Sequence, residues 1–221
     1  MAVIDGKTMK INIADIRQDY SKKELRKKDC QDHPTEQFNV WLQEAIDAEV
    51  VEPTAMTLAT ADKDGRPSSR TVLLKGVEDN RFIFYTNYKS RKGSQLVENP
   101  YASISFFWKE LERQVNVEGT VTKVAESTSD EYFASRPYKS RVGAWASEQS
   151  KEISSKNVIK LRFVEYSMKH ITNVPRPPHW GGYAIDPERV EFWQGRPSRL
   201  HDRIVYEKQE NGLWAKKRVA P

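Results

Sequence analysis

From Thr54 to the C-terminus, short strand-like segments separated by turns dominate the sequence. TAMTLATA and SSRTVLLKGV flank the turn DKDG, and RFIFYTN, YASISFFW and RQVNVEGTVTKV follow them. VEFWQG and RIVYEKQENGLWAKKRV end the series, and the ENG within the second is a hairpin signal. About six or seven strands with a few inserted helices predict an antiparallel β-barrel with helical additions.

Helical patterns precede and interrupt these strands. HPTEQFNVWLQEAIDAEV has Pro34 near its start and then apolar residues at helical spacing, namely Phe38, Trp41, Leu42, Ala45 and Ile46. The preceding IADIRQDYSKKELRKK is expected to form a shorter helix or an arm. SRKGSQLVENP predicts a short helix closed by Asn99 and Pro100, and STSDEYFASRP opens with good helix-start residues. We expect one domain over residues 1–221 with a helical segment at about 1–50.

Charge and cysteine content narrow the classes of protein. The chain has 36 basic and 31 acidic residues, a net charge of +5, which fits a small phosphate-bearing ligand and is weak support for nucleic acid. Cys30 is the single cysteine, consistent with a reducing compartment. The four histidines lack metal-ligand spacing, so no structural metal is expected. Neither a signal peptide nor an apolar run of about 18 residues is present, so we expect a cytoplasmic protein.

The stretch RPSRLHDR, from Arg196 to Arg203, concentrates cationic and hydrogen-bonding groups. If its second half is extended, Arg199, His201 and Arg203 share one face of a strand. Two cations around an imidazole suit an anionic, planar ligand. The alternative is a strand end whose charges are merely solvated.

Other segments, far apart in the chain, combine Arg or Lys with hydroxyl or amide side chains. They are SSRTVLLK, FYTNYKSRK, ERQVNVEG, EYFASRPYKS and GAWASEQS. Ser90, Arg91, Lys92 and Gly93 stand at a predicted helix start, which favours an anion. Each segment alone is compatible with ordinary surface. Together they favour one site that binds more than one phosphate.

These segments, together with PPHWGGY and FWQGRPSRLHDR, occur in the order found in the pyridoxamine 5'-phosphate oxidase family, which the chain resembles from IRQDY to RVAP. The resemblance implies an FMN-binding split β-barrel and a homodimer with sites at the subunit interface. It implies oxidation of pyridoxamine 5'-phosphate and pyridoxine 5'-phosphate by molecular oxygen to pyridoxal 5'-phosphate, with release of hydrogen peroxide. Apolar surface expected around Phe106, Trp108 and Trp145 is a further reason to expect a dimer.

The resemblance also implies roles for individual residues. Those matching positions that line FMN are Arg70, Val72, Leu73, Leu74, Lys75, Tyr85, Thr86, Arg91, Lys92, Gln114, Gln149, Ser150, Trp193 and Arg203. Those matching positions that hold the substrate phosphate are Lys75, Tyr132, Arg136 and Ser140. The candidate catalytic residues are Arg199, which would clamp the substrate ring, and His201, which would bond its 3-oxygen. Arg203 is a candidate for offsetting negative charge on the reduced flavin. Arg17 and Tyr20 match an N-terminal segment that can cover the site.

Some features stay open. The chain departs from the family pattern at four positions outside the assigned site, which are Asn116, Arg141, Val142 and Ala184. Arg70 and Lys75 are five positions apart, so a regular strand would place them on opposite faces. A bulge could rejoin them, or they serve different ligands. Two other functions remain: another split-barrel flavin oxidoreductase, such as a flavin reductase, and a non-enzymatic nucleic-acid binder.

Overall fold

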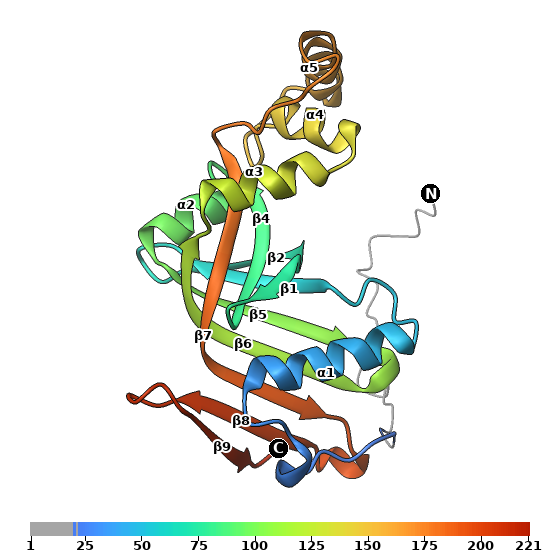
Figure 1. The fold of residues 1–221 in the computed structure, drawn as a ribbon, viewed down its shortest axis with the longest axis vertical. Coiled ribbons are helices and arrows are strands. Elements are labelled where there is room, and N and C mark those ends of the chain that lie inside the picture. Colours follow the sequence, from blue (N-terminus) through green and yellow to red (C-terminus); the bar gives the residue numbers. More distant parts are fainter. Residues whose placement is uncertain (1–19, 21) are drawn as a thin grey trace, which may run out of the picture.

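A curled antiparallel sheet of nine strands organises the computed structural model, which describes Tyr20 and residues 22–221 (Figure 1). The strand order is β2-β1-β5-β6-β7-β4-β3, and β8 pairs with both β7 and β9. The strands are β1 (Ala55–Ala61), β2 (Pro67–Leu73), β3 (Gly76–Glu78), β4 (Arg81–Asn87), β5 (Tyr101–Trp108), β6 (Arg113–Lys123), β7 (Trp180–Gln194), β8 (Asp202–Lys208) and β9 (Trp214–Val219). The predicted architecture, mainly β and antiparallel with helical additions, is confirmed.

The number of strands exceeds the six or seven that we predicted. Leu74 and Lys75 interrupt the second predicted segment, so that β2 and β3 are separate strands. The last predicted segment is a hairpin of two strands, β8 and β9, as its ENG turn indicates. Leu74 donates its amide to Thr54 and Lys75 donates its amide to Ile83, so the break is held from both sides.

The described residues include five α-helices and three short 3₁₀ turns. They are α1 (Pro34–Asp47), α2 (Arg91–Glu98), α3 (Glu126–Ser135), α4 (Tyr138–Ala146) and α5 (Lys156–Lys169), with η1 (Lys27–Asp29), η2 (Lys109–Leu111) and η3 (Pro197–Arg199). α1 and α2 are confirmed as predicted, whereas α4 and α5 were not predicted. α3 is confirmed and begins at Glu126, one residue before the predicted segment, with Ala125 as its N-cap residue. The predicted shorter helix or arm over residues 13–28 is not an α-helix where the structure describes it, since residues 22–26 are irregular and only η1 follows them. Residues 13–19 and 21 of that segment lie outside the described residues.

Strand β7 connects the two ends of the sheet. Its first half pairs with β4, from Trp180 opposite Asn87 to Ile185 opposite Phe82, and its second half pairs with β8. β6 pairs along nearly all of it, with a register shift where Gly119 meets Pro187. Residues at the beginning and end of β7 therefore belong to opposite ends of the molecule, separated by roughly 46 Å along the strand at about 3.3 Å per residue.

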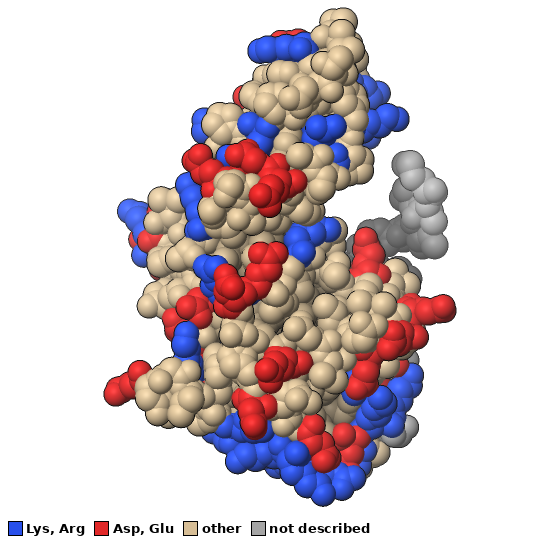
Figure 2. Space-filling model, viewed as in Figure 1, with Lys and Arg blue, Asp and Glu red and all other residues tan. Residues whose placement is uncertain are grey.

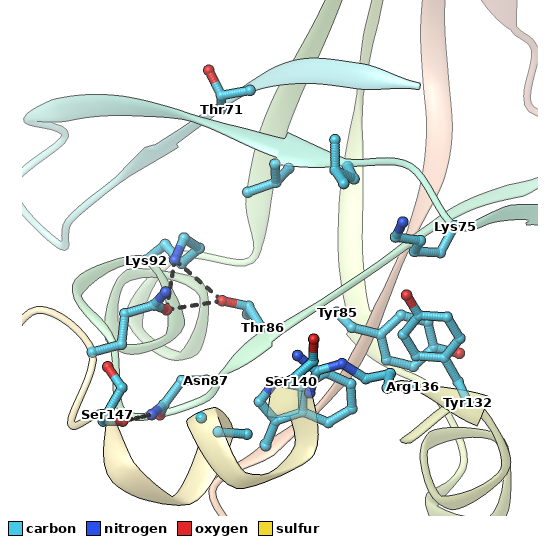
Figure 3. A pocket seen from close by; sticks show the side chains of 16 residues that line it. Thr71, Lys75, Tyr85, Thr86, Asn87, Lys92, Tyr132, Arg136, Ser140 and Ser147 are labelled. Carbon is cyan, nitrogen blue, oxygen red and sulfur yellow. Dashed lines mark hydrogen bonds between the residues drawn. The ribbon is translucent and has the colours of Figure 1, made fainter. Parts of the chain in front are cut away.

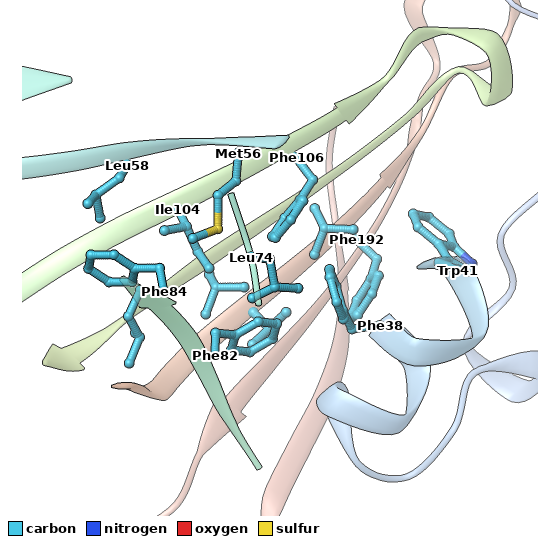
Figure 4. Close-up of a cluster of buried hydrophobic side chains, with 14 of the residues drawn as sticks. Phe38, Trp41, Met56, Leu58, Leu74, Phe82, Phe84, Ile104, Phe106 and Phe192 are labelled. Atoms are coloured by element: carbon cyan, nitrogen blue, oxygen red, sulfur yellow. The ribbon is translucent and has the colours of Figure 1, made fainter. Parts of the chain in front are cut away.

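The main hydrophobic core lies between the inner face of the sheet and α1 (Figure 4). Phe38 of α1 packs against Phe82, Phe106 and Trp108, with ring centroids 4.8–6.0 Å apart. Phe106 and Trp108 are 0% and 2% exposed, and the Trp108 indole donates to the Pro53 carbonyl. The apolar surface that we expected around these two residues is therefore absent, because α1 covers them within the same chain.

A smaller cluster holds the helices at the other end of the sheet. Its fully buried members are Phe133, Val142, Val174 and Trp180, which come from α3, α4, the loop after α5 and the start of β7. Trp145 is partly buried against this cluster and donates to the Pro175 carbonyl. Figure 1 shows α3, α4 and α5 together at the end of the sheet opposite the β8–β9 hairpin. No helix of residues 22–221 is long and apolar enough to span a membrane.

Candidate functional site

A cavity of about 460 Å³ opens between the β2–β3 break, β4, and helices α3 and α4 (Figure 3). Its lining residues are Thr71, Val72, Leu73, Lys75, Tyr85, Thr86, Asn87, Lys92, Tyr132, Arg136, Ser140, Gly143, Ala144, Ser147, Gln149 and Trp180. Ten of these carry assignments implied by the family resemblance. Residues that are up to 109 positions apart, from Thr71 to Trp180, thus meet around one space.

Lys92 forms the polar floor at one end of the cavity. Its ammonium is buried and donates to Thr86 Oγ1 at 3.1 Å and to Gln149 Oε1 at 3.0 Å. Burial, and then the charge of the nearby Arg70, lower the pKa of Lys92 to about 8. A buried cation that is hydrogen-bonded to neutral groups and repelled by a second cation has unused affinity for an anion.

Arg70 lies beside Lys92 without lining the cavity itself. Its guanidinium donates to Thr60 Oγ1 at 2.6 Å and to Ser68 Oγ at 2.7 Å. Burial, and then the charge of Arg91, lower the pKa of Arg70. No described carboxylate pairs with Arg70, Arg91 or Lys92. Since Ser90 caps the N-terminus of α2 at this place, the cluster is suited to a phosphate.

Arg136 stands at the other end of the cavity, with Lys75, Tyr132 and Ser140 (Figure 3). Its Nη1 is buried and has no hydrogen-bond partner among the described residues. Burial lowers the pKa of Arg136, while the Tyr132 hydroxyl opposes that shift. A buried, unpaired guanidinium nitrogen costs free energy unless an acceptor reaches it, so this end of the cavity also fits a phosphate.

Three aromatic rings stack along the cavity wall beside Arg136. The nearly parallel rings of Tyr85, Tyr132 and Trp180 contact one another, with centroids 3.9 Å apart for Tyr85 and Tyr132, 5.5 Å for Tyr85 and Trp180, and 6.2 Å for Tyr132 and Trp180. Desolvation raises the pKa of Tyr85 to about 12, so its hydroxyl stays protonated. Gly182 leaves the room for this ring, because a Cβ at that position would lie 2.8 Å from a Tyr85 ring carbon.

A second group of assigned residues lies on the outer face of the sheet, away from this cavity. Gln114, Trp193 and Arg203 are direct neighbours across β6, β7 and β8. Tyr20 and His201 join them, since the Trp193 ring lies 5.7 Å from Tyr20 and 4.6 Å from His201. Trp193 and the cavity residue Trp180 stand at opposite ends of β7, so one chain does not bring the two groups together.

His201 has a defined hydrogen-bonding state in this second group. Its Nδ1 accepts from the Arg196 amide at 3.1 Å, so the neutral ring carries its proton on Nε2. Burial, and then the Arg199 charge, lower the pKa of His201, which favours that neutral form. Nε2–H is therefore available to donate to a ligand oxygen.

Our expectation that Arg199, His201 and Arg203 share the face of one extended strand is wrong. Ser198 and Arg199 adopt left-handed backbone conformations, with φ of 56° and 60°, in the turn after Pro197. β8 begins only at Asp202, so Arg203 is a strand residue and Arg199 is an exposed turn residue.

Arg203 is also more tightly paired than we expected. It donates to both carboxylate oxygens of Glu191, at 2.7 and 3.1 Å. Glu191 accepts from Arg189 as well, at 2.8 Å, and Arg189 bridges to Glu118. Burial alone would raise the pKa of Glu191, but these hydrogen bonds lower it. The carboxylate thus offsets much of the charge that Arg203 could offer to a flavin.

The remaining assigned residues have varied surroundings. Leu74 is 3% exposed in the main core, so only its backbone could contact a ligand. Arg91 is exposed at the start of α2, and Ser150 is exposed after α4. Arg17 lies outside the described residues. Lys75 lines the cavity whereas Arg70 does not. That the two serve different ligands, one of the explanations open from their spacing, stays a prediction.

Sequence reasoning missed several lining residues, which are Thr71, Asn87, Gly143, Ala144, Ser147 and Trp180. Asn87 donates to the Ser147 carbonyl and thereby ties β4 to the end of α4. Trp180 lies within PPHWGGY, a motif that carried the resemblance without an assigned role. No group of three or more His, Cys, Asp or Glu side chains suited to a metal ion occurs among residues 22–221.

Two family models match the chain. The model described as pyridoxamine 5'-phosphate oxidase covers residues 42–170, and the model described as the pyridoxine 5'-phosphate oxidase C-terminal dimerisation region covers residues 180–221. The first therefore takes in both the cation cluster and the Arg136 end of the cavity. The second takes in Trp180, Trp193, His201 and Arg203.

Individual relatives agree with these models. The chain is 61% identical over 213 residues to a pyridoxine/pyridoxamine 5'-phosphate oxidase of Chromobacterium violaceum, covering 96% of this chain and 100% of the relative. It is 59% identical over 211 residues to the enzyme of that name from Actinobacillus succinogenes, with the same coverage. Among solved structures, PhzG from Burkholderia lata 383, in complex with tetrahydrophenazine-1-carboxylic acid, matches with a TM-score of 0.86 at 33% identity, covering 91% of this chain and 100% of that chain.

Proposed function

The chain belongs to the pyridoxamine 5'-phosphate oxidase family, and from this premise we propose that its cavity binds FMN together with pyridoxine 5'-phosphate or pyridoxamine 5'-phosphate. The reaction is oxidation of the substrate at C4' by molecular oxygen. Pyridoxine 5'-phosphate and oxygen yield pyridoxal 5'-phosphate and hydrogen peroxide. Pyridoxamine 5'-phosphate also consumes water and releases ammonia. This reaction is the last step in the synthesis of the vitamin B6 cofactor.

The observation that carries the proposal is the pair of cationic groups at the two ends of one cavity. Lys92, with Arg70 beside it, lies at one end, and Arg136 lies at the other. Neither group has a carboxylate partner among the described residues, and Arg136 Nη1 has no hydrogen-bond partner among them. Two phosphates in one site require two such groups, and FMN and the substrate each bring one.

The donor set fits FMN at the α2 end of the cavity. Lys92, Arg70 and Arg91 would hold a terminal phosphate at the N-terminus of α2, where Ser90 caps the helix. The chain has no dinucleotide fingerprint, so a mononucleotide is favoured over FAD. When bound, the flavin supplies the hydride acceptor that no side chain can provide.

The side chains of this protein orient the substrate. Arg136, Lys75, Tyr132 and Ser140 would bind its phosphate with two cations and two hydroxyls. Arg199 would press the substrate ring into place, and His201 would donate from Nε2 to the 3-oxygen of the ring. Glu191 would fix Arg203 beside the isoalloxazine, where the Arg203–Glu191 pair presents oriented donors with little net charge.

We further propose a homodimer in which each site draws on both subunits. The C-terminal region matches a model described as a dimerisation region, and it contains the Trp193, His201 and Arg203 group. That group and the cavity lie at opposite ends of β7 within one chain. A twofold axis that placed one subunit's outer face over its partner's cavity would complete both sites.

The two alternative functions predict other properties. A nucleic-acid binder needs a broad basic surface, whereas Figure 2 shows acidic and basic side chains interleaved over the face in view. A flavin reductase would share the cofactor site, but it would not need a second set of phosphate-binding side chains around Arg136. The buried Nη1 of Arg136, which has no hydrogen-bond partner among the described residues, therefore favours the oxidase.

The decisive experiment starts from the visible spectrum of the purified protein. A yellow protein whose heat-released flavin runs as FMN supports the cofactor, and flavin that runs as FAD would refute it. Anaerobic addition of pyridoxine 5'-phosphate should bleach the flavin and form an equal amount of pyridoxal 5'-phosphate. Admission of oxygen should restore the colour with release of hydrogen peroxide. Bleaching by a reduced nicotinamide but not by pyridoxine 5'-phosphate would indicate the flavin reductase instead.

A further inference from the structure

The Arg136 guanidinium rests on aromatic faces rather than on a carboxylate. Its central carbon lies 4.6 Å from the centroid of the Trp180 ring and 5.4 Å from that of Phe133. Trp180 is 7% exposed and lines the cavity, so this contact is largely shielded from water. A cation over an indole face gains more from the ring quadrupole when both groups are desolvated.

The kind of partner matters for what Arg136 can still bind. A carboxylate would hold the guanidinium strongly, but it would occupy two N–H donors and repel an incoming phosphate. An aromatic face stabilises the same cation from the side and uses none of its donors. The unpaired Nη1 of Arg136 is what this arrangement predicts.

Trp180 is itself held in place from two sides. Its ring stacks on Tyr85 at 5.5 Å, and Tyr85 stacks in turn on Tyr132. Its backbone carbonyl accepts from Arg176 at 2.8 Å, and Arg176 pairs with Asp130 of α3 at 2.6 Å. The start of β7 is thereby tied to α3, whose C-cap residue is Arg136, so the indole and the guanidinium keep a fixed relation.

We propose that Trp180 is a positioning residue for substrate specificity: its indole face holds the Arg136 guanidinium in the cavity with its N–H donors free for the phosphate of the substrate. The inference rests on the proposed function and deepens it. It assigns the preference for phosphorylated substrates to an Arg–Trp pair rather than to Arg136 alone. Trp180 needs no contact with the reacting atoms for this role.

The test compares Trp180→Leu and Trp180→Phe with the wild-type holoenzyme. Leucine removes the aromatic face, and we expect roughly a tenfold rise in KM for pyridoxine 5'-phosphate with a smaller change in kcat. Phenylalanine keeps a weaker aromatic face, so its KM should lie between those of wild type and Trp180→Leu. With unphosphorylated pyridoxine, kcat/KM should be nearly the same in all three proteins. FMN affinity, measured by fluorescence titration of the apoprotein, should not change.

Two controls separate positioning from a general structural effect. In the Arg136→Ala background, Trp180→Leu should add little further loss with pyridoxine 5'-phosphate, because the pair acts as one unit. Trp41→Leu removes a similar contact in the main core, where the Arg113 guanidinium lies 4.2 Å from the ring centroid. That variant should lose thermal stability without a selective rise in KM for the phosphorylated substrate.

The outcomes distinguish the inference from the function on which it rests. Equal losses with pyridoxine 5'-phosphate and pyridoxine in the Trp180 variants, or loss of FMN, would make Trp180 merely structural and overturn the inference. If Trp180→Leu does not fold, the same comparison of substrates with Trp180→Phe decides, with about a threefold selective rise in KM expected. A wild-type protein that does not oxidise pyridoxine 5'-phosphate would overturn the proposed function and this inference with it.

Discussion

Lys92 is the residue whose ionisation bears most directly on cofactor binding. Its ammonium is buried, hydrogen-bonded to Thr86 and Gln149, and close enough to Arg70 to be repelled by it. These surroundings lower its pKa to about 8. A bound phosphate would reverse both effects, because it supplies the missing counter-charge and thus raises the pKa again.

The affinity for FMN should therefore depend on pH. Binding is at full strength well below pH 8, where Lys92 is protonated even without ligand. It weakens by up to about tenfold per unit as the pH rises through 8, because free protein loses the proton that bound protein keeps. Fluorescence titrations of the apoprotein with FMN at pH 7, 8 and 9 measure this change. Lys92→Arg keeps its charge over that range and should show little dependence; the same fall in that variant would assign the effect to another group.

For single residues, the sequence-based prediction agrees with the structure where the function depends on residues that are neighbours in the sequence. Ser90, Arg91 and Lys92 predicted an anion site from their place at a helix start, and the structure brings Arg70 beside them. The role of Trp180 could not be predicted in this way, since an indole in a Pro- and Gly-rich segment has no single meaning. Its importance depends on Arg136, which is 44 positions away in the sequence and meets it only in the folded chain.

Among the elements, the position of α2 depends on one close backbone contact. Gly93 packs against the backbone of Tyr88, and a Cβ there would lie 2.1 Å from the Tyr88 carbonyl oxygen. Gly93→Ala should therefore shift α2, lower the free energy of unfolding by about 1–3 kcal/mol and weaken FMN binding. Chemical denaturation and FMN titration check both effects.

Gly143 provides the matched control, because a Cβ there would meet no atom of the protein within 4 Å. It lies inside α4, so Gly143→Ala should leave the stability of the apoprotein unchanged or raise it by up to about 1 kcal/mol. If the two alanine variants were equally stable, the close packing of α2 against Tyr88 would not matter for the fold.

Elements that the sequence did not predict have identifiable causes. The apolar residues of α5 do not form one continuous stripe, so the helical periodicity of hydrophobic residues is weak there. None of the residues of α5 is buried. The first half of β7 contains Gly181, Gly182 and Pro187, all of which argue against a strand. The sheet accepts Pro187 because β6 shifts register there, and it accepts the glycines because Tyr88 and Tyr85 pack against them.

For the whole molecule, we propose that the described residues fold as one unit. The main core includes Leu25 near one end of the chain and Tyr206 near the other, and β7 pairs with strands at both ends of the sheet. Unfolding followed by tryptophan fluorescence and by circular dichroism should give coincident, single transitions. Separate transitions would contradict this proposal and would indicate two folding units, with a boundary near the border between the two family matches.

For the whole molecule, the proposed homodimer is the feature that the structure of one chain does not include. The resemblance implied a site at a subunit interface, and the positions of Trp180 and Trp193 at opposite ends of β7 give this a physical reason. The apolar surface that we expected to drive dimerisation at Phe106 and Trp108 is buried in the main core. The proposed interface is instead the half-exposed outer face around Gln114, Trp193 and Arg203.

Subunit complementation tests the central claim, that two copies of the chain each supply half of one site. Arg136→Ala disables the cavity half and His201→Ala disables the outer-face half, so each homodimer should have very low activity on pyridoxine 5'-phosphate. If the two variants are unfolded together and refolded as a mixture, about half of the dimers are hybrids with one intact site. The account predicts recovery of roughly a quarter of wild-type activity. A mixture as inactive as its parents, in which mass spectrometry shows that hybrids have formed, would contradict it.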